Sequence, residues 1–156
     1  MSDRPTSQKL NEVEQLYQQG RYHEALPLAR SLCEPPSQTL EYAEALNHLG
    51  NIQRELAQYA EAESPFLQAL TIKSSQLGKE HPDYARSLKD LAKLYEAQGQ
   101  YRQAESLARQ ALSIREAALG ADHADSLDSQ QYLANIHEML GRLSQARELT
   151  EQTLEK

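Results

Sequence analysis

Apolar residues recur at helical spacing along most of the chain. Between residues 86 and 96 they fall at Leu88, Leu91, Leu94 and Tyr95, and the following segment continues with apolar positions 104, 107, 108, 111, 112 and 114. Steps of three or four residues place such side chains on one face of an α-helix. The pattern therefore predicts two successive amphipathic helices with a short polar joint around Gly99.

The same pattern returns at a fixed interval. Residues 58–78 and 100–120, aligned without a gap, are identical at 11 of 21 positions and lie 42 residues apart. The joint sequence GQYRQAE at 99–105 returns in altered form as GRLSQAR at 141–147, as AQYAEAE at 57–63 and as GRYHEAL at 20–26. Repeats of about 20 to 50 residues are typical of solenoids, in which each repeat buries its apolar face against its neighbours. The sequence thus predicts an all-α solenoid of four repeats.

Each repeat is predicted to be a hairpin of two antiparallel helices. Gly20, Gly99 and Gly141 stand at the joints, where glycine readily takes the left-handed conformation that ends a helix. The predicted hairpins span residues 6–33, 39–77, 82–119 and 123–155. They form a single domain over residues 1–156, with repeats at about 6–38, 39–80, 81–122 and 123–156.

Recurring residues also mark the helix starts and the contact between the two helices. Pro82 suits the first turn of a helix, and His81 and its repeat equivalent His123 are predicted to be loop or cap residues. A small residue recurs in the first helix, where we expect it to let the two helix backbones approach closely. These small residues are Gly50, Ala92 and Ala134.

Composition narrows the class of protein. The 156 residues are 39% hydrophobic and 25% charged, which suits one core with a solvated surface. The net charge of −7 argues against binding to nucleic acid, which requires a basic face. No apolar run reaches the roughly 18 residues of a membrane span, and the polar start MSDRPTSQKL favours a cytoplasmic protein without an anchor or signal peptide.

The sequence offers no pattern for a cofactor, a metal ion or catalysis. Cys33, the single cysteine, lies in an apolar run and is predicted to be a small buried core residue. The five histidines lack the spacing of a metal-binding motif. A nucleophile elbow and a glycine-rich phosphate loop are also absent, so we expect no enzymatic activity.

The repeated residues resemble the tetratricopeptide repeat. A leucine followed by a small residue recurs in three first helices, as Leu49-Gly50, Leu91-Ala92 and Leu133-Ala134. The interval of 42 residues and the segment LGKEHPDYARSLKDLAKLYEAQGQYRQAESLARQALSIRE are similar to the longer variant found in kinesin light chains and many bacterial proteins. The resemblance implies a right-handed superhelix whose first helices line a concave groove that binds a peptide or partner segment.

First-helix residues that core packing does not use are predicted to line this groove. The candidates are Asn47, His48, Asn51, Arg54, Arg86, Lys89, Lys93, Gln131, Tyr132 and Asn135, with acidic neighbours that include Glu44, Glu96 and Asp128. Three of the candidates, at positions 86, 89 and 93, form a basic stripe in an acidic chain, which favours an acidic partner segment. The alternative for this stripe is a solvated helix face on which Arg86 pairs with Asp90 one turn on. The amides can donate and accept hydrogen bonds along an extended peptide backbone.

A second interpretation of function stays open. The last helix carries Leu149, Thr153 and Leu154, and no further helix follows them in the sequence. Solenoids normally cover their ends. The alternative to a peptide-binding module is therefore a self-associating scaffold, with a homodimer formed through the C-terminal hairpin, or a segment of a longer array.

Overall fold

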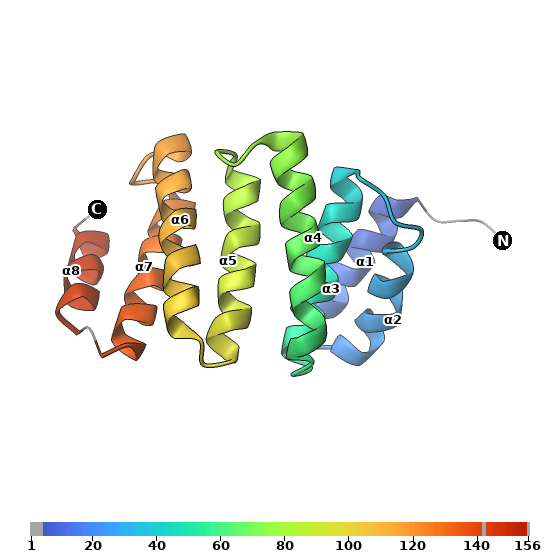
Figure 1. The fold of residues 1–156 in the computed structure, drawn as a ribbon, viewed down its shortest axis with the longest axis horizontal. Coiled ribbons are helices and arrows are strands. Elements are labelled where there is room, and N and C mark those ends of the chain that lie inside the picture. The colour runs from blue at the N-terminus through green and yellow to red at the C-terminus, as the bar shows by residue number, and fades with distance from the viewer. Residues whose placement is uncertain (1–4, 142, 156) are drawn as a thin grey trace. The chain divides into compact units, whose positions relative to one another are not determined.

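The structure, a computed structural model, describes residues 5–141 and 143–155; positions 1–4, 142 and 156 of the predicted domain lie outside the described residues. Within these ranges the chain forms eight α-helices and no strand, which confirms the predicted all-α hairpins (Figure 1). The hairpin limits lie within one residue of those predicted. The helices are α1 Thr6–Gln18, α2 Tyr22–Leu32, α3 Leu40–Glu55, α4 Tyr59–Leu77, α5 Pro82–Ala97, α6 Tyr101–Leu119, α7 Ala124–Met139 and α8 Leu143–Leu154.

The helices form two compact units, unit 1 from Met1 to Gln76 and unit 2 from Leu77 to Lys156. In unit 1, α1 packs on α2 and α3, α2 packs on α3, and α3 shares a core with α4. In unit 2, each of the helices α5 to α8 packs on the next along the chain. Each unit therefore contains two of the four helical hairpins.

The joints within the hairpins end the first helix with a left-handed residue. At the α5–α6 joint, where Gly99 has φ of 77°, the Gly99 N–H donates to the Glu96 carbonyl oxygen at 2.9 Å and the Gln100 N–H to the Tyr95 carbonyl oxygen at 2.8 Å. This pair of bonds satisfies carbonyl groups that the end of the helix would otherwise leave unpaired. Ala57 holds the same place between α3 and α4 with φ of 59°, although this conformation costs an alanine roughly 1–2 kcal/mol.

Histidines cap α5 and α7. The Nδ1 of His81 accepts a hydrogen bond from the Asp83 N–H, and the Nδ1 of His123 accepts one from the Asp125 N–H, each at 3.0 Å. The imidazoles satisfy backbone donors that the first turn of a helix leaves without an intrahelical partner. The predicted loop or cap role of both histidines is confirmed.

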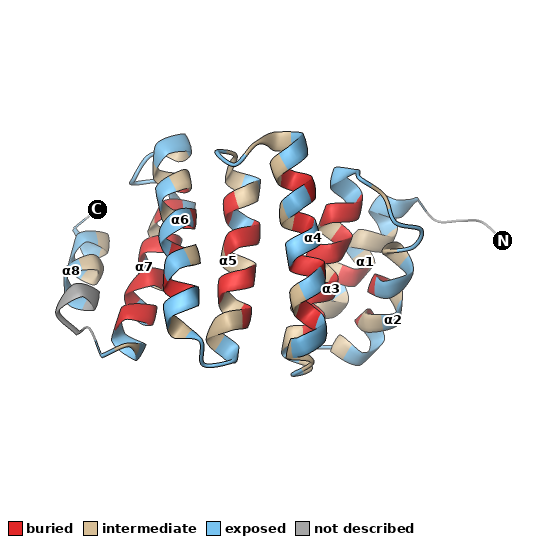
Figure 2. Cartoon of the chain, in the orientation of Figure 1, coloured by how far each residue is buried: buried red, intermediate tan, exposed pale blue. Residues whose placement is uncertain are grey.

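Each unit has its own apolar core, visible as buried faces of the helices in Figure 2. The core of unit 1 includes one cluster of Val13, Ala25, Ala29, Leu49 and Ile52, and another of Tyr42, Ala43, Leu46, Ala69 and Ile72. One in unit 2 comprises Ala92, Ala104 and Ile136, with Tyr95, Leu107, Tyr132 and Leu140 packed against it. No helix in the described part of the chain is both long and apolar enough to cross a membrane.

Cys33 is less buried than the sequence indicates. It is half-buried at the end of α2 and packs against the apolar clusters around Val13 and Tyr42, so the prediction of a buried core residue is wrong in the extent of burial. It is the C-cap residue of α2, directly after Leu32. Burial, together with the charge of Glu34, raises the pKa of the thiol to about 11. The thiol therefore stays protonated at neutral pH.

Gly50, in the interior of α3, makes room for an aromatic ring. A Cβ at this position would lie 2.7 Å from the Cζ of Phe66, which is fully buried on α4. The expectation that a small residue here serves the approach of two backbones is therefore wrong at Gly50, because a side chain fills the space. Forty-two residues later the corresponding positions hold Ala92 and Ala108. At this contact the α3–α4 hairpin therefore pairs a glycine with a large aromatic side chain, whereas the α5–α6 hairpin has an alanine at each of the two positions.

Candidate functional site

In unit 1, α3 carries the four predicted groove residues. Asn47 is only 1% exposed, and His48, Asn51 and Arg54 are half-buried. His48 lies between two carboxylates: its Nδ1 is 3.3 Å from Glu14 of α1, and its Nε2 is 3.8 Å from Glu44 on its own helix. The imidazole thus links α1 to α3.

Arg54 also contributes to the contact between α1 and α3. Its NH2 donates to the Tyr17 hydroxyl at 3.1 Å and to a Glu55 carboxylate oxygen at 2.8 Å. Burial, opposed by the charge of Arg54 and reinforced by that of Glu55, raises the pKa of Tyr17 to about 12, so the hydroxyl stays neutral. The side-chain oxygen of Asn51 is buried and accepts no hydrogen bond from the described residues.

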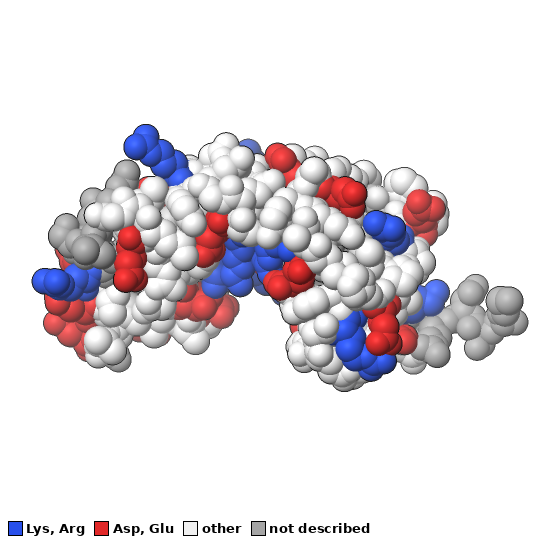
Figure 3. Space-filling view, turned by 90° about the horizontal axis from the view of Figure 1, so that it is seen from below, with Lys and Arg blue, Asp and Glu red and all other residues white. Residues whose placement is uncertain are grey.

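In unit 2, the predicted residues lie on α5 and α7. Arg86, Gln131 and Asn135 are exposed, while Lys89, Lys93 and Tyr132 are half-buried. We call these six residues, together with Asp128, the α5–α7 surface. Seen from below in Figure 3, Lys and Arg side chains gather at the level of α5, with acidic side chains beside them.

Lys89 connects the two helices. Its ammonium donates a hydrogen bond to the Asp128 carboxylate of α7 and lies 5.2 Å from the centre of the Tyr132 ring. A cation over an aromatic face is attracted by the electron-rich ring. The side chain of Lys89 is only 12% exposed, whereas that of Asp128 is 59% exposed. The half-buried Lys89 ammonium is therefore paired with a carboxylate that is itself mostly exposed to solvent.

Three cationic side chains, Lys89, Lys93 and Arg115, act electrostatically on the Asp128 carboxylate. Arg115 of α6 approaches its carboxylate to 3.5 Å. Partial burial acts to raise the pKa of the Asp128 carboxyl, but the hydrogen bond and charge of Lys89 and the charges of Arg115 and Lys93 outweigh it and hold this pKa below its usual range. Asp128 is consequently ionised at neutral pH.

Polar side chains complete the α5–α7 surface. The Tyr132 hydroxyl donates to the Glu96 carboxylate of α5 at 2.9 Å, and the Gln131 amide donates to the Asn135 side-chain oxygen at 3.0 Å. Among the described residues, no three histidine, cysteine or carboxylate side chains come close enough together to hold a metal ion. What the surface offers chemically is ion pairing and hydrogen bonding.

Comparison with known proteins decides the family. A tetratricopeptide repeat model matches residues 41–117 and 97–156, and a second tetratricopeptide repeat model matches residues 9–31. The chain belongs to the tetratricopeptide repeat family. A tetratricopeptide repeat fold of this kind is a protein-interaction or scaffold module. No curated protein sequence matches the chain.

Several solved structures share the fold. TPR-like repeats, nearly identical to one another, of a kinesin light chain candidate from Podosopora anserina superpose with a TM-score of 0.84 at 26% identity, over 97% of this chain and 75% of that one. BtubC (BKLC) from P. vanneervenii has a TM-score of 0.77 at 17% identity, over 91% and 58% of the two chains. The type III secretion translocator chaperone SycD of Yersinia enterocolitica has a TM-score of 0.65 at 19% identity, over 83% and 81%. The likeness supports the kinesin-light-chain type of tetratricopeptide repeat.

Sequence reasoning missed Arg115, because it lies on a second helix of the tetratricopeptide array. It is 6% exposed, and its NH1 donates to the Ser129 hydroxyl at 2.8 Å and to the Asp125 carbonyl oxygen at 3.2 Å. Lys73 stands 42 residues earlier, is 3% exposed, and lies 3.7 Å from Glu44 of α3. A cation recurring after isoleucine in both repeats was the signal that could have revealed this position.

Proposed function

We propose that the α5–α7 surface binds an acidic segment of a partner protein. The observation that carries the proposal is the set of cations around Asp128, whose carboxylate accepts a hydrogen bond from the Lys89 ammonium and lies 3.5 Å from Arg115 NH1. One face of α5 carries the cations Arg86, Lys89 and Lys93, although the chain as a whole has a net charge of −7. A segment rich in aspartate or glutamate is the complementary ligand.

Spacing along α5 supports an extended or helical ligand with several carboxylates. Arg86, Lys89 and Lys93 follow one another at intervals of three and four residues, so their side chains lie on one face of the helix. Gln131 and Asn135, exposed on α7, are suited to hydrogen bonds with the backbone of the ligand. Exposed charges each contribute about 1 kcal/mol or less, so we expect micromolar, salt-sensitive binding.

The unit 1 residues are proposed to take a smaller part. Asn47 is buried, and His48 and Arg54 already contact carboxylates of unit 1. Asn51, which is half-buried, is the residue of this set proposed to hydrogen-bond a partner backbone, as a donor through its side-chain amide N–H because its side-chain oxygen is buried. Binding to unit 2 does not depend on this contact.

Reversing two charges of the α5–α7 surface is expected to weaken binding of an acidic peptide. In the Arg86→Glu/Lys93→Glu variant, attraction becomes repulsion at two positions, which lowers the affinity for a labelled hexaglutamate peptide by about tenfold or more. Lys89 stays unchanged, because a glutamate there would face Asp128. Fluorescence anisotropy at low and high salt measures both the affinity and its salt dependence.

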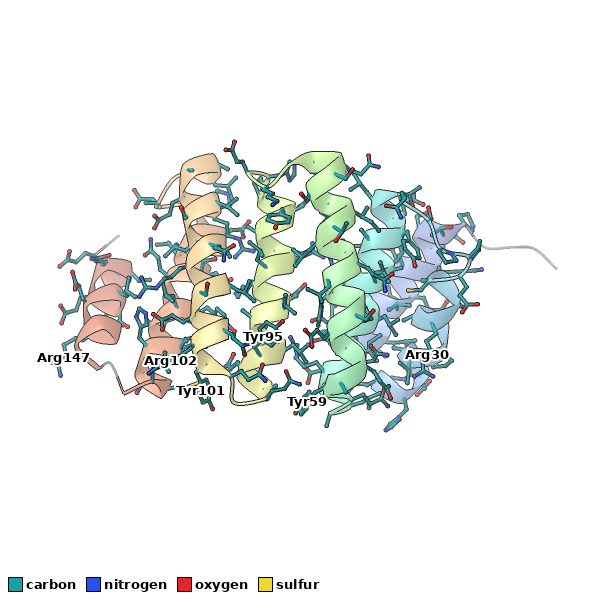
Figure 4. The ribbon with its side chains drawn as sticks, viewed as in Figure 1. Arg30, Tyr59, Tyr95, Tyr101, Arg102 and Arg147 are labelled. Carbon is teal, nitrogen blue, oxygen red and sulfur yellow. The ribbon has the colours of Figure 1, made fainter. Side chains whose placement is uncertain are left out.

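A matched control separates the site from net charge. Arg102 of α6 and Arg147 of α8 are exposed positions on second helices of the same unit (Figure 4). The Arg102→Glu/Arg147→Glu variant changes the net charge by the same amount and should bind the peptide almost as the wild type does. Equal losses in the two variants, or no loss in either, would contradict the proposed surface.

A second candidate function is self-association through α8. Leu154 is 81% exposed, and Leu149 is half-buried on the same helix. We expect multi-angle light scattering at micromolar concentration to show a dimer, and the Leu154→Asp variant to shift it towards the monomer because the aspartate must be desolvated in the interface. If the wild-type protein has the molar mass of a monomer at micromolar concentration and still has it at a concentration 100-fold higher, self-association through α8 is ruled out.

A further inference from the structure

Asp128 occupies the place next to Lys89 where a carboxylate of the partner would bind. It lies in the second turn of α7, accepts the hydrogen bond of the Lys89 ammonium from α5, and is 3.5 Å from Arg115 NH1 of α6. More than half of its side chain is exposed. A carboxylate arriving from solvent would therefore meet Asp128 before it meets Lys89.

The cations around Asp128 are held in place independently of it. The Lys89 ammonium also lies over the Tyr132 ring, and the Tyr132 hydroxyl is fixed by Glu96. Arg115 NH1 donates to the Ser129 hydroxyl and to the Asp125 carbonyl oxygen. Removing the charge of Asp128 would therefore leave a preformed cationic site instead of releasing the side chains that build it.

We propose that Asp128 is an internal competitor that restricts the α5–α7 surface to partners with several closely spaced carboxylates. This inference rests on the proposed function of that surface. A tethered carboxylate acts at a high effective concentration, on the order of millimolar, so a single carboxylate in solution displaces it poorly. A run of acidic residues can contact Arg86, Lys89 and Lys93 at the same time, because Arg86 and Lys93 lie one turn to either side of Lys89. The added contacts allow such a ligand to displace Asp128 from Lys89. Asp128 selects by excluding the weaker ligand.

The test compares neutral variants of Asp128 with the wild type against two labelled peptides. One peptide carries a single glutamate among glycine and serine with both ends blocked, and the other is hexaglutamate. In Asp128→Asn, whose side chain has nearly the same shape, we expect affinity for hexaglutamate to rise about fivefold and binding of the single-glutamate peptide to become measurable. Asp128→Ser, a second neutral variant, should behave alike, and Asp128→Glu should retain the wild-type preference.

Asp125 supplies the matched control. It lies one turn earlier on α7, its side chain is also 59% exposed, and its carboxylate is near His123. Asp125→Asn therefore makes the same change in net charge and should leave both affinities within about twofold of the wild type. Thermal melting of each variant verifies that it is folded.

Two outcomes separate this inference from the proposed function. If wild type binds hexaglutamate and loses it in Arg86→Glu/Lys93→Glu, but the neutral Asp128 variants bind no tighter, Asp128 is not a competitor and the surface remains. Equal tightening by Asp125→Asn also overturns the inference, because the effect then follows net charge. If the wild type and all variants fail to bind hexaglutamate, both proposals fall.

Discussion

Replacing Ile136 with aspartate is expected to unfold unit 2. Ile136 is fully buried and packs with Ala92 and Ala104, while Leu107 and Leu140 lie against the same cluster. An aspartate there would place a charge among apolar side chains, and burying an unpaired charge costs several kcal/mol. Domains are stable by only about 5–15 kcal/mol, so this one change removes much of the stability.

Circular dichroism at 222 nm and urea denaturation measure the effect. A large loss of helical signal at 25 °C, or a much lower denaturation midpoint, is the expected result for Ile136→Asp. Ile136→Val is the matched control, because loss of one methylene in a core costs only about 0.5–1.5 kcal/mol. A fully helical Ile136→Asp variant with wild-type stability would mean that α7 packs in a different register.

Gly50→Ala is expected to destabilise unit 1, although alanine is the better helix former. The higher helix propensity of alanine contributes about 1 kcal/mol in favour of the variant. Against it, the new Cβ would lie 2.7 Å from the buried Phe66 ring. Overpacking of this kind costs about 1–3 kcal/mol and more where the neighbour cannot move. We therefore expect a net loss of about 1 kcal/mol or more in urea denaturation.

A double-mutant cycle tests the cause of that loss. Phe66→Ala alone should cost about 3–5 kcal/mol, because it leaves a cavity in the core. Gly50→Ala/Phe66→Ala recreates the pair that the next repeat uses at Ala92 and Ala108. The combined loss should be smaller than the two single losses together by at least about 1 kcal/mol. Additive losses would show that the ring does not set the tolerance at position 50.

The helical hairpins were predictable because their signals are local. Apolar spacing marked the helices, and Gly99 with its copies marked the joints, where a left-handed residue lets two backbone bonds close the helix end. Ala57 shows the limit of such a signal, since the joint forms there without glycine. The partnership of Gly50 with Phe66 was not predictable, because it depends on which side chain of α4 reaches α3.

The candidate site was predictable in its positions but not in its pairing. Lys89 and Tyr132 were both predicted to lie on the groove-facing side of a first helix, on α5 and α7 respectively. The structure brings the two side chains into contact. The hydrogen bond from Lys89 to Asp128 could not be read from spacing, since it depends on the register between α5 and α7. Arg115 was not predicted, because the sequence alone does not distinguish a buried arginine on a second helix from one exposed to solvent.

Bonds between successive first helices have a consequence for how quickly the chain can fold. Lys89 to Asp128, Tyr132 to Glu96 and Arg54 to Tyr17 join residues 39, 36 and 37 positions apart. Closing a loop of this length costs only slightly more entropy than forming one hairpin, because the cost of closure grows slowly with loop length. Each hairpin can search for its neighbour within about one repeat of chain. Lengthening the array by whole repeats would therefore add stability without slowing that search.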